Sequence, residues 1–225
     1  MALHQILILT LCSAAAFVSP TAAQSANVQT GTQEPNGYTW GELALLPEYC
    51  RDAQGILYEG LGSNNMSPRA PHWLALLGDD YWHIHHYCHG MRNLMRIDSG
   101  AVEPMHRGSL LERTIGEFNY IVRNSKPSMP LMPEVFYRMG EVHLRLNQVA
   151  QALACFERSR QLKPDYWPSY VRWIDVLLQS RQFEAAEALA KEGLEHVPGQ
   201  PELLKRLKAS QTKSVAGAKV ATERK

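Results

Sequence analysis

Between residues 133 and 200, apolar positions recur with the period of amphipathic helices, and short polar segments separate the helical stretches. This pattern predicts four helices, near 134–146, 150–162, 167–180 and 184–196. The dipeptides Asn147-Gln148 and Arg181-Gln182 fall between the members of each pair as polar turns. Pro164 and Pro198 end the second helix of each pair, because proline lacks a backbone donor and clashes with the preceding turn. Two consecutive helical hairpins are therefore expected.

The two hairpins repeat with a fixed period. Pro130, Pro164 and Pro198 are each 34 residues apart, and the same step relates Ala152 to Ala186. It also relates larger residues, namely Phe136 to Tyr170 and Met139 to Trp173. The two alanines fall where the helices of a hairpin would cross most closely, so only a small side chain fits there. A period of this length is typical of a helical repeat.

The repeat resembles that of the tetratricopeptide family, a helical hairpin marked by apolar and aromatic residues, a small residue and a closing proline. Residues 133–166 carry the matching positions Phe136, Met139-Gly140, His143, Ala152, Phe156 and Pro164. Residues 167–200 carry Tyr170, Trp173, Leu177, Ala186 and Pro198, with Ile174 in place of the glycine and Ala190 in place of the second aromatic. The resemblance implies an all-α solenoid of helical hairpins with a helical amino-terminal extension. It also implies a scaffold that binds a protein or peptide.

Such a stack needs a cover at its carboxyl end, since a repeat does not bury its faces alone. Residues 201–209 are expected to form a capping helix, with Leu203, Leu204 and Leu207 as its apolar stripe. Residues 210–225 are expected to form a disordered basic tail, because they hold few large apolar residues.

Upstream of the repeats, a helical region is expected over 41–132. Helical patterns over 79–97 and 110–124 predict a degenerate hairpin there, with a longer connection than the turns of the two repeats. Residues 24–40, ahead of this region, are expected to form a flexible linker.

The first residues have the composition of a secretory signal. Positions 6–18 are mostly apolar or small and too few to span a bilayer, and Thr21-Ala22-Ala23 follows with small side chains. A signal peptide over 1–23, cleaved before Gln24, is predicted, with a short membrane anchor as the alternative. The mature protein is then expected to be periplasmic or secreted, without stable insertion in a membrane.

Export would leave three cysteines, Cys50, Cys88 and Cys155. In an oxidising compartment an exposed pair tends to form a disulfide, and the first two lie in the same amino-terminal section, so a Cys50–Cys88 bridge is predicted. In the chain-entropy model, closing a loop of this size stabilises by roughly 4 kcal/mol. Two free thiols, or two metal ligands, are the alternatives.

Charge and motif content narrow the function. Lys and Arg total 23 against 22 Asp and Glu, so no overall field attracts nucleic acid or an acidic membrane. Spacing along the chain does not link a nucleophile, a base and an orienting group. A binding module is therefore favoured over an enzyme, with a protein or peptide rather than nucleic acid as its partner.

The segment 81–91 concentrates four of the nine histidines. His85 and His89 are four residues apart on one helix face with Cys88 beside them, a spacing that suits two ligands of Zn or Cu. A metal or haem site is one hypothesis, although no glutamate accompanies the pair as in zinc proteases. A simpler one packs His86 and His89 in the aromatic core of the hairpin, and a third gives the cluster a role in polar recognition. No other cofactor is expected.

The family resemblance also implies a binding face, because the first helix of each repeat lines the concave surface in that family. The implied positions are Glu134, Tyr137, Glu141, Leu144 and Arg145, followed by Pro168, Val171, Asp175, Leu178 and Gln179. Tyr137 with Glu141 and Asp175 favours an extended peptide that carries a cationic or hydrogen-bonding group. Segments 81–91 and 46–52 are also similar to the leaders of uncharacterised exported bacterial repeat proteins, a likeness that supplies no activity. As an exported scaffold, the protein is expected to be part of an envelope assembly.

Overall fold

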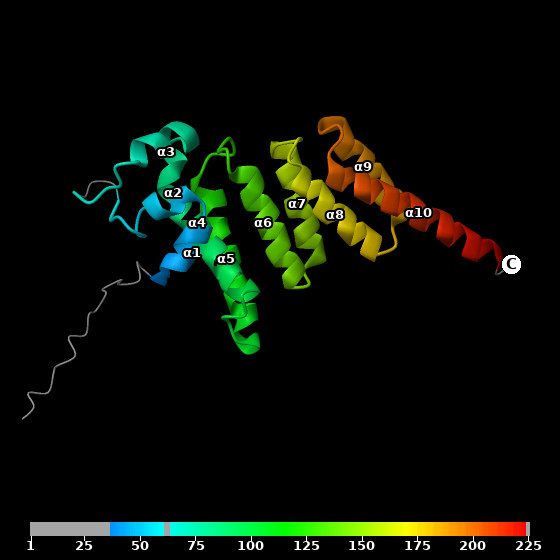
Figure 1. The fold of residues 1–225 in the computed structure, drawn as a ribbon, viewed down its shortest axis with the longest axis horizontal. Coiled ribbons are helices and arrows are strands. Elements are labelled where there is room, and N and C mark those ends of the chain that lie inside the picture. Colours follow the sequence, from blue (N-terminus) through cyan, green and yellow to red (C-terminus); the bar gives the residue numbers. More distant parts are fainter. Residues whose placement is uncertain (1–36, 61–63, 224–225) are drawn as a thin grey trace, which may run out of the picture. The chain divides into compact units, whose positions relative to one another are not determined.

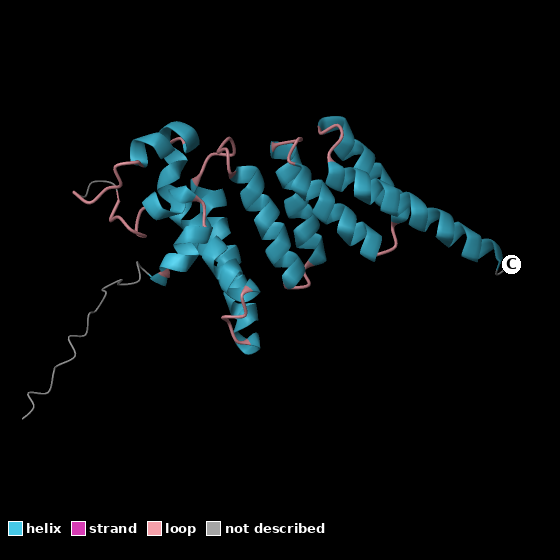
Figure 2. Ribbon diagram, in the orientation of Figure 1, coloured by secondary structure: helices cyan, strands magenta, loops and turns pink. Residues whose placement is uncertain are grey.

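The computed structural model describes residues 37–60 and 64–223, with backbone alone from 215 onward, and all of them belong to the unit Glu34–Lys225. Within these residues the regular elements are helices, and no strand is present (Figure 2). The α-helices are α1 (Trp40–Leu45), α2 (Glu48–Asp52), α3 (Ala70–Leu77), α4 (Ile84–Asp98), α5 (Pro104–Asn124), α6 (Met132–Arg145), α7 (Val149–Leu162), α8 (Trp167–Gln179), α9 (Phe183–His196) and α10 (Pro201–Glu223). The all-α prediction is confirmed. The predicted signal peptide, residues 1–23, lies outside the described residues.

The two predicted repeats form antiparallel helical hairpins, α6 with α7 and α8 with α9 (Figure 1). Each helix begins and ends within two residues of its predicted bounds. Both hairpins use the same turn, in which Asn147 and Arg181 have a φ of 58°. The backbone N–H of the following residue then donates to His143 O in the first hairpin and to Leu177 O in the second. This turn satisfies carbonyls that the end of the first helix would otherwise leave unpaired.

Close approach of paired helices depends on a glycine that faces an aromatic ring. A Cβ atom at Gly140 would lie 2.4 Å from the ring of Phe156, and a Cβ atom at Gly90 would lie 2.4 Å from the ring of Phe118. Gly90 belongs to α4 and Phe118 to α5, so the predicted degenerate hairpin exists and packs as the first repeat does.

The bounds of this upstream hairpin differ from the prediction. Its first helix, expected over 79–97, begins as a 3-10 turn over Asp79–His83, and α4 proper begins at Ile84. Its second helix begins at Pro104, six residues earlier than expected. Proline suits the first turn of a helix, because the donor that it lacks would be unpaired there in any case.

Residues 37–40 are part of the fold, which corrects the end of the predicted 24–40 linker. Tyr38 is fully buried, and Thr39 caps α1 through reciprocal hydrogen bonds with Glu42. The rest of that linker lies outside the described residues.

The predicted disulfide is present and joins α2 to α4. Cys50 and Cys88 are both fully buried, and their sulfur atoms are 2.07 Å apart. Their Cα atoms are separated by 5.6 Å, within the usual range for a bridged pair. The bridge fastens the amino-terminal helices to the first helix of the upstream hairpin.

Asp52 holds the other amino-terminal elements together. Its carboxylate accepts hydrogen bonds from Ser67 Oγ at 2.7 Å and from Trp73 Nε1 at 2.6 Å. Its backbone carbonyl accepts a third hydrogen bond, from Tyr81 OH at 2.6 Å. The carboxylate is buried and its oxygens are satisfied, so the charge is accommodated without an open site.

Helix α10 continues through most of the predicted disordered tail, 210–225, and so corrects that prediction for residues 210–223. Gln211 Nε2 donates to Glu187 Oε1 at 3.2 Å, and Ser214 Oγ donates to Glu184 Oε1 at 3.1 Å. Both acceptors belong to α9, which therefore provides partners for the extra turns. Once a helix has formed, each further residue adds a backbone hydrogen bond, so the extension follows readily.

Two clusters of buried side chains lie between these helices, one spanning α1 to α7 and the other α8 to α10. Buried hydroxyls join them, since Ser169 Oγ donates to Ser159 Oγ and Ser159 Oγ donates to Pro133 O, each at 2.7 Å.

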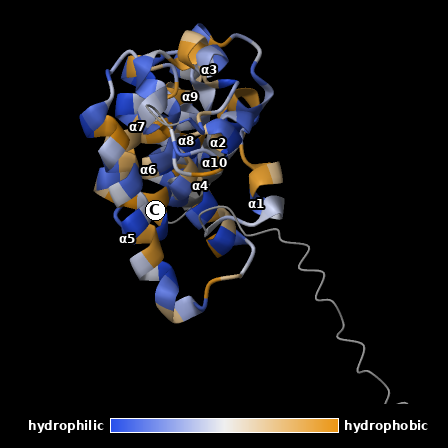
Figure 3. Cartoon of the chain, turned by 90° about the vertical axis from the view of Figure 1, so that its left-hand side faces the viewer, coloured by the Kyte–Doolittle hydropathy of each residue, from blue (hydrophilic) through white to orange (hydrophobic). Residues whose placement is uncertain are grey.

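The α8–α9 hairpin reverses the sizes of the two side chains that meet between its helices. The larger Ile174 takes the place of Gly140 and the smaller Ala190 takes the place of Phe156, and both are fully buried. Apolar and polar residues alternate along the helices in Figure 3, as expected when each helix buries one face.

Candidate functional site

A chain of ion pairs crosses the first helices of the repeats and the helix that follows them. Its members are Glu134, Arg138 and Glu141 in α6, Arg172 and Asp175 in α8, and Arg206 in α10. We call the surface that carries them the ladder face. Successive charges alternate in sign, with nitrogen–oxygen distances of 3.1–3.3 Å at all but one step, and 3.9 Å between Arg172 and Asp175. Arg206 also pairs with Glu202 of its own helix.

Tyrosines surround the start of this ladder. Tyr87 of α4 donates its hydroxyl to Glu134 Oε1 at 2.7 Å, and the Arg138 guanidinium lies 5.3 Å from the centre of the Tyr137 ring. Burial raises the pKa of Tyr137 to about 12 and that of Tyr87 well above its ordinary value. Burial alone would lower the pKa of Arg138, but Tyr87, Glu134 and neighbouring acidic groups raise it. These tyrosines are neutral and the arginine is charged at any physiological pH.

The ladder face is hollowed near the turns of the two repeats. A pocket of about 260 Å³ is lined by Leu144, Asn147, Val149, Arg172, Asp175, Val176, Gln179 and Ser180. We call it the turn pocket. Val149 is 46% exposed there, and the half-buried Leu144 adds further apolar surface. The turn pocket can therefore accept an apolar side chain beside polar groups that form hydrogen bonds.

The histidine cluster lies between α4, α5 and the residues that precede α1. His86 Nδ1 is 2.7 Å from Glu117 Oε2, and the His86 ring stacks on Tyr120 with centroids 3.6 Å apart. His89 Nδ1 is hydrogen-bonded to Tyr38 OH at 2.6 Å. This arrangement agrees with the packing alternative, in which the histidines form a polar and aromatic layer of the hairpin.

Burial lowers the pKa of two histidines of the cluster, His85 and His89. It lowers the pKa of His85 to about 4, an effect to which the neighbouring His86 and His89 add. Burial and then the Arg92 charge lower the pKa of His89. Burial alone would raise the pKa of Glu117, but the hydrogen bond from His86 and nearby positive charges lower it. The uncharged form of His85 therefore predominates near neutral pH.

The geometry gives limited support to a metal centre. The His85 and His89 rings are 5.9 Å apart, and Cys88 is committed to the disulfide. Across 37–60 and 64–223, no three His, Cys, Asp or Glu side chains are grouped so as to hold a metal ion. The assignment of Zn or Cu to His85 and His89 stays a prediction.

Comparison with known families identifies part of the chain. The model of the tetratricopeptide repeat matches residues 133–166. Residues 133–166 therefore form a tetratricopeptide repeat. No curated protein matches its sequence. Tetratricopeptide repeats are scaffolds for protein–protein interaction, and such scaffolds are typically not enzymes.

The structure brings together four of the ten residues that the resemblance places on the binding face. Glu134, Tyr137, Glu141 and Asp175 all belong to the ladder face. Their surroundings differ from the expectation, because the arginines of the repeat protein itself already neutralise the three carboxylates. The cationic group expected from a partner is thus supplied from within the chain.

Two further predicted residues lie outside the ladder. Arg145 pairs with Asp98 of α4 at 2.7 Å, and Val171 is only 7% exposed. Val171 therefore offers little surface to a partner. The role of the binding-face residues in partner binding stays a prediction.

Sequence reasoning missed the arginines of the ladder. Arg138 lies four residues after Glu134 and three before Glu141, a spacing that favours ion pairs on one helix and was readable in the sequence. The pairs from Arg172 to Glu141 and from Arg206 to Asp175 join different helices, so no local spacing indicates them.

Proposed function

We propose that this tetratricopeptide-repeat protein is an exported scaffold that binds a segment of a protein partner at the turn pocket. The observation that carries the proposal is the pocket itself, which lies at the turns of the repeat and exposes Val149 beside hydrogen-bonding groups. Three positions of the binding face implied by the family resemblance, Leu144, Asp175 and Gln179, line it. Elsewhere on the ladder face the charges are paired within the chain.

The balance of charge indicates the chemistry of the bound segment. Three guanidinium groups of the ladder face three carboxylates, with Glu202 as a fourth beside Arg206. The ladder face therefore offers no excess charge to attract a strongly basic or acidic peptide. Such a peptide would have to break existing ion pairs in order to form new ones. We expect an extended segment that inserts an aliphatic side chain at Val149 and forms neutral hydrogen bonds with Gln179 and the backbone of the turns.

Two features support export. The apolar stretch and small residues of 1–23 have the pattern of a secretory signal. The buried Cys50–Cys88 disulfide is of the kind that persists in oxidising compartments and is rare in the cytosol. We place the protein in the periplasm or outside the cell, as a member of an envelope assembly.

Within residues 37–60 and 64–223, no helix combines the length and the apolar character that a membrane crossing requires.

The test of the scaffold is site-directed crosslinking at the turn pocket in intact cells. A photoreactive residue at Gln179 should capture one protein partner, and Val149→Arg should reduce that product by about tenfold, because it places a charge in the apolar part of the pocket. Leu204→Arg is the matched control, since Leu204 is exposed to a similar extent, 47%, and does not line the pocket. An equal yield of the product from the Val149→Arg variant would refute the proposed site.

Export is tested separately. Fractionation followed by mass determination of the intact protein should find the mature chain outside the cytoplasm, beginning at Gln24. A chain that stays in the cytoplasm with residues 1–23 attached would contradict the proposed location, whatever the crosslinking shows.

A further inference from the structure

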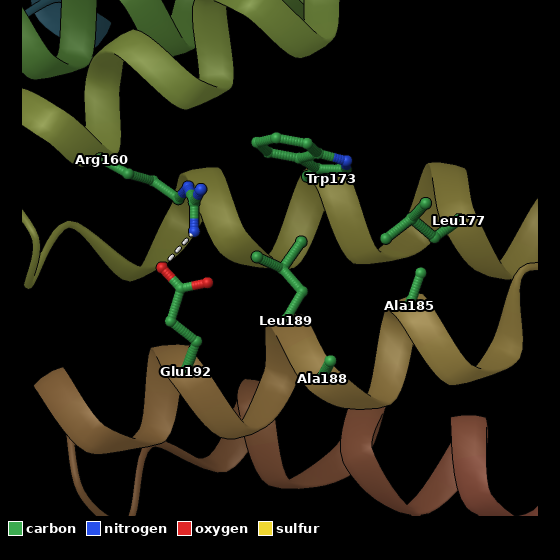
Figure 4. A pocket seen from close by; sticks show the side chains of 7 residues that line it. All are labelled: Arg160, Trp173, Leu177, Ala185, Ala188, Leu189 and Glu192. Carbon is green, nitrogen blue, oxygen red and sulfur yellow. Dashed lines mark hydrogen bonds and ion pairs between the residues drawn. The ribbon is translucent and has the colours of Figure 1, made fainter.

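A second hollow lies on another side of the repeats, between α7 and α9 (Figure 4). It has a volume of about 360 Å³ and is lined by Arg160, Trp173, Leu177, Ala185, Ala188, Leu189 and Glu192. We call it the α7–α9 groove. None of these residues lines the turn pocket. Successive residues of an α-helix are rotated by about 100° around its axis. On α8, this places Trp173 and Leu177 roughly 130° around the helix from the residues that face the turn pocket. The two hollows are therefore separate surfaces.

The groove is open because small side chains form one wall. Ala185 and Ala188 of α9 are exposed and leave room above α8, whereas Leu177 and Leu189 are buried at the base. Trp173 is partly exposed and stands beside this space (Figure 4). Tryptophan is enriched among the residues that contribute most to binding at protein interfaces, so a partly exposed tryptophan next to small residues suits the insertion of an apolar side chain by a partner.

Arg160 fixes one end of the groove. Its guanidinium lies 4.8 Å from the Trp173 ring centre and 4.7 Å from that of Tyr170, and it pairs with Glu192 at 2.7 Å. The Arg160 side chain is only 13% exposed, whereas that of Glu192 is 47% exposed. The positive charge is therefore enclosed in the wall, and the carboxylate is the charge that a partner meets.

The rim of the groove adds further negative charge. Glu195 follows Glu192 by one turn on α9, and Glu157 precedes Arg160 by one turn on α7, and both are exposed. Lys191 is directed elsewhere, because it pairs with Glu187, which in turn accepts a hydrogen bond from Gln211 of α10. Glu157, Glu192 and Glu195 are all exposed at this end, so electrostatic complementarity favours a basic group on the partner.

We infer that the α7–α9 groove binds an amphipathic helix of a protein partner, which presents two large apolar side chains one turn apart followed by Lys or Arg. The apolar pair would rest on Trp173 and Leu177, which are themselves one turn apart on α8. The basic residue would reach Glu192, about 10 Å along α9 from Ala185. Ala185 and Ala188 allow the backbone of such a helix to come close. This surface is independent of the turn pocket and of the function proposed for it.

The experiment selects peptides against the groove. A phage-displayed library of helix-forming peptides of about 15 residues, long enough for four turns, is selected on the mature full-length protein. Every selected clone is then tested for binding to the Ala188→Trp variant, in which a ring fills the groove. We expect the selected peptides to share two large apolar residues three or four positions apart and a Lys or Arg one or two turns later.

One selected peptide is then synthesised, and its affinity is measured for the original protein and for variants of the groove. Fluorescence anisotropy should show binding weakened about tenfold or more by Ala188→Trp and by Glu192→Lys, the latter partly restored when the peptide Lys is replaced by Glu. The matched control is Ala154→Trp, since Ala154 is also exposed and lies one repeat earlier at the same position of its helix. That variant should bind within about twofold of the original protein, and circular dichroism should show all three variants to be equally helical.

Several results would overturn the inference. The selection could yield no peptide whose binding is weakened by Ala188→Trp. The selected peptides could carry acidic residues in place of basic ones. The Glu192→Lys variant could bind the peptide as tightly as the original protein. Loss of binding in Val149→Arg with Ala188→Trp unaffected would assign the peptides to the turn pocket instead. Sedimentation that shows a dimer of the original protein and a monomer of Ala188→Trp would make a second copy of this chain the occupant.

Discussion

Replacing Gly140 with alanine tests whether the close approach of α6 and α7 holds the first repeat together. The added Cβ would lie 2.4 Å from the ring of Phe156, which is fully buried. Overpacking of a core costs about 1–3 kcal/mol, and the upper end applies here because the obstacle is a rigid ring. Alanine also favours a helix over glycine by about 1 kcal/mol. We therefore expect Gly140→Ala to lower the free energy of unfolding by about 2 kcal/mol.

Gly116→Ala is the matched control for this prediction. Gly116 is also inside a helix, α5, but a Cβ atom there would meet no atom within 4 Å. Only the helix preference remains, so this variant should gain about 0.5–1 kcal/mol. Urea unfolding followed by circular dichroism gives both free energies. A Gly140→Ala variant as stable as Gly116→Ala would show that the glycine is not required by the contact.

A double substitution identifies Phe156 as the obstacle. Phe156→Leu removes part of the ring that meets the new Cβ, so Gly140→Ala should cost less in that background than alone. We expect a coupling energy of about 1 kcal/mol or more, as is common for residues in direct contact. Simple additivity of the two substitutions would refute the steric explanation even if both variants are destabilised.

Three further predictions concern other parts of the fold. Replacing Cys50 and Cys88 with alanine should lower the free energy of unfolding by about 3–4 kcal/mol, since the bridge spans 38 residues; an unchanged urea midpoint would refute this. Arg181→Gly should raise the melting temperature by a few degrees, because Arg181 adopts a φ of 58° that costs a side-chain-bearing residue about 1 kcal/mol; a lower melting temperature would contradict it. The pKa of His85 is lowered from 6.5 to about 4, so its contribution to stability is complete above pH 6.5 and is lost as pH falls towards 4. His85→Leu should therefore lessen the acid-induced loss of stability by about 2 kcal/mol, after allowance for partial exposure, and an identical pH profile would refute the assignment.

Local rules in the sequence determined the repeats. The signals that revealed them were the 34-residue period, the polar turns, and Pro164 and Pro198. Each turn and each proline lies at the end of a helix, where the backbone geometry follows from neighbouring residues. The upstream hairpin was found in the same way, although its second helix begins earlier than its apolar pattern suggested. The disulfide was predictable because Cys50 and Cys88 are the two cysteines that precede the repeats once the predicted signal peptide is removed.

The elements that sequence reasoning missed depend on partners far along the chain. Residues 37–40 join the fold because Tyr38 reaches His89 of α4, and the extended part of α10 finds Glu184 and Glu187 on α9. Neither segment has a strong pattern of its own. Their order comes from surfaces that exist only after the hairpins have packed.

The binding surfaces show the same division. The sequence by itself determined which helices form and which residues share a face of each helix, because those depend on a spacing of three or four positions. Only the tertiary structure decided that Arg172 and Arg206 neutralise the expected binding carboxylates, and that Ala185 and Ala188 leave a groove beside Trp173. An ion pair between helices and a hollow between helices both depend on distances across the stack, and those distances are set by packing.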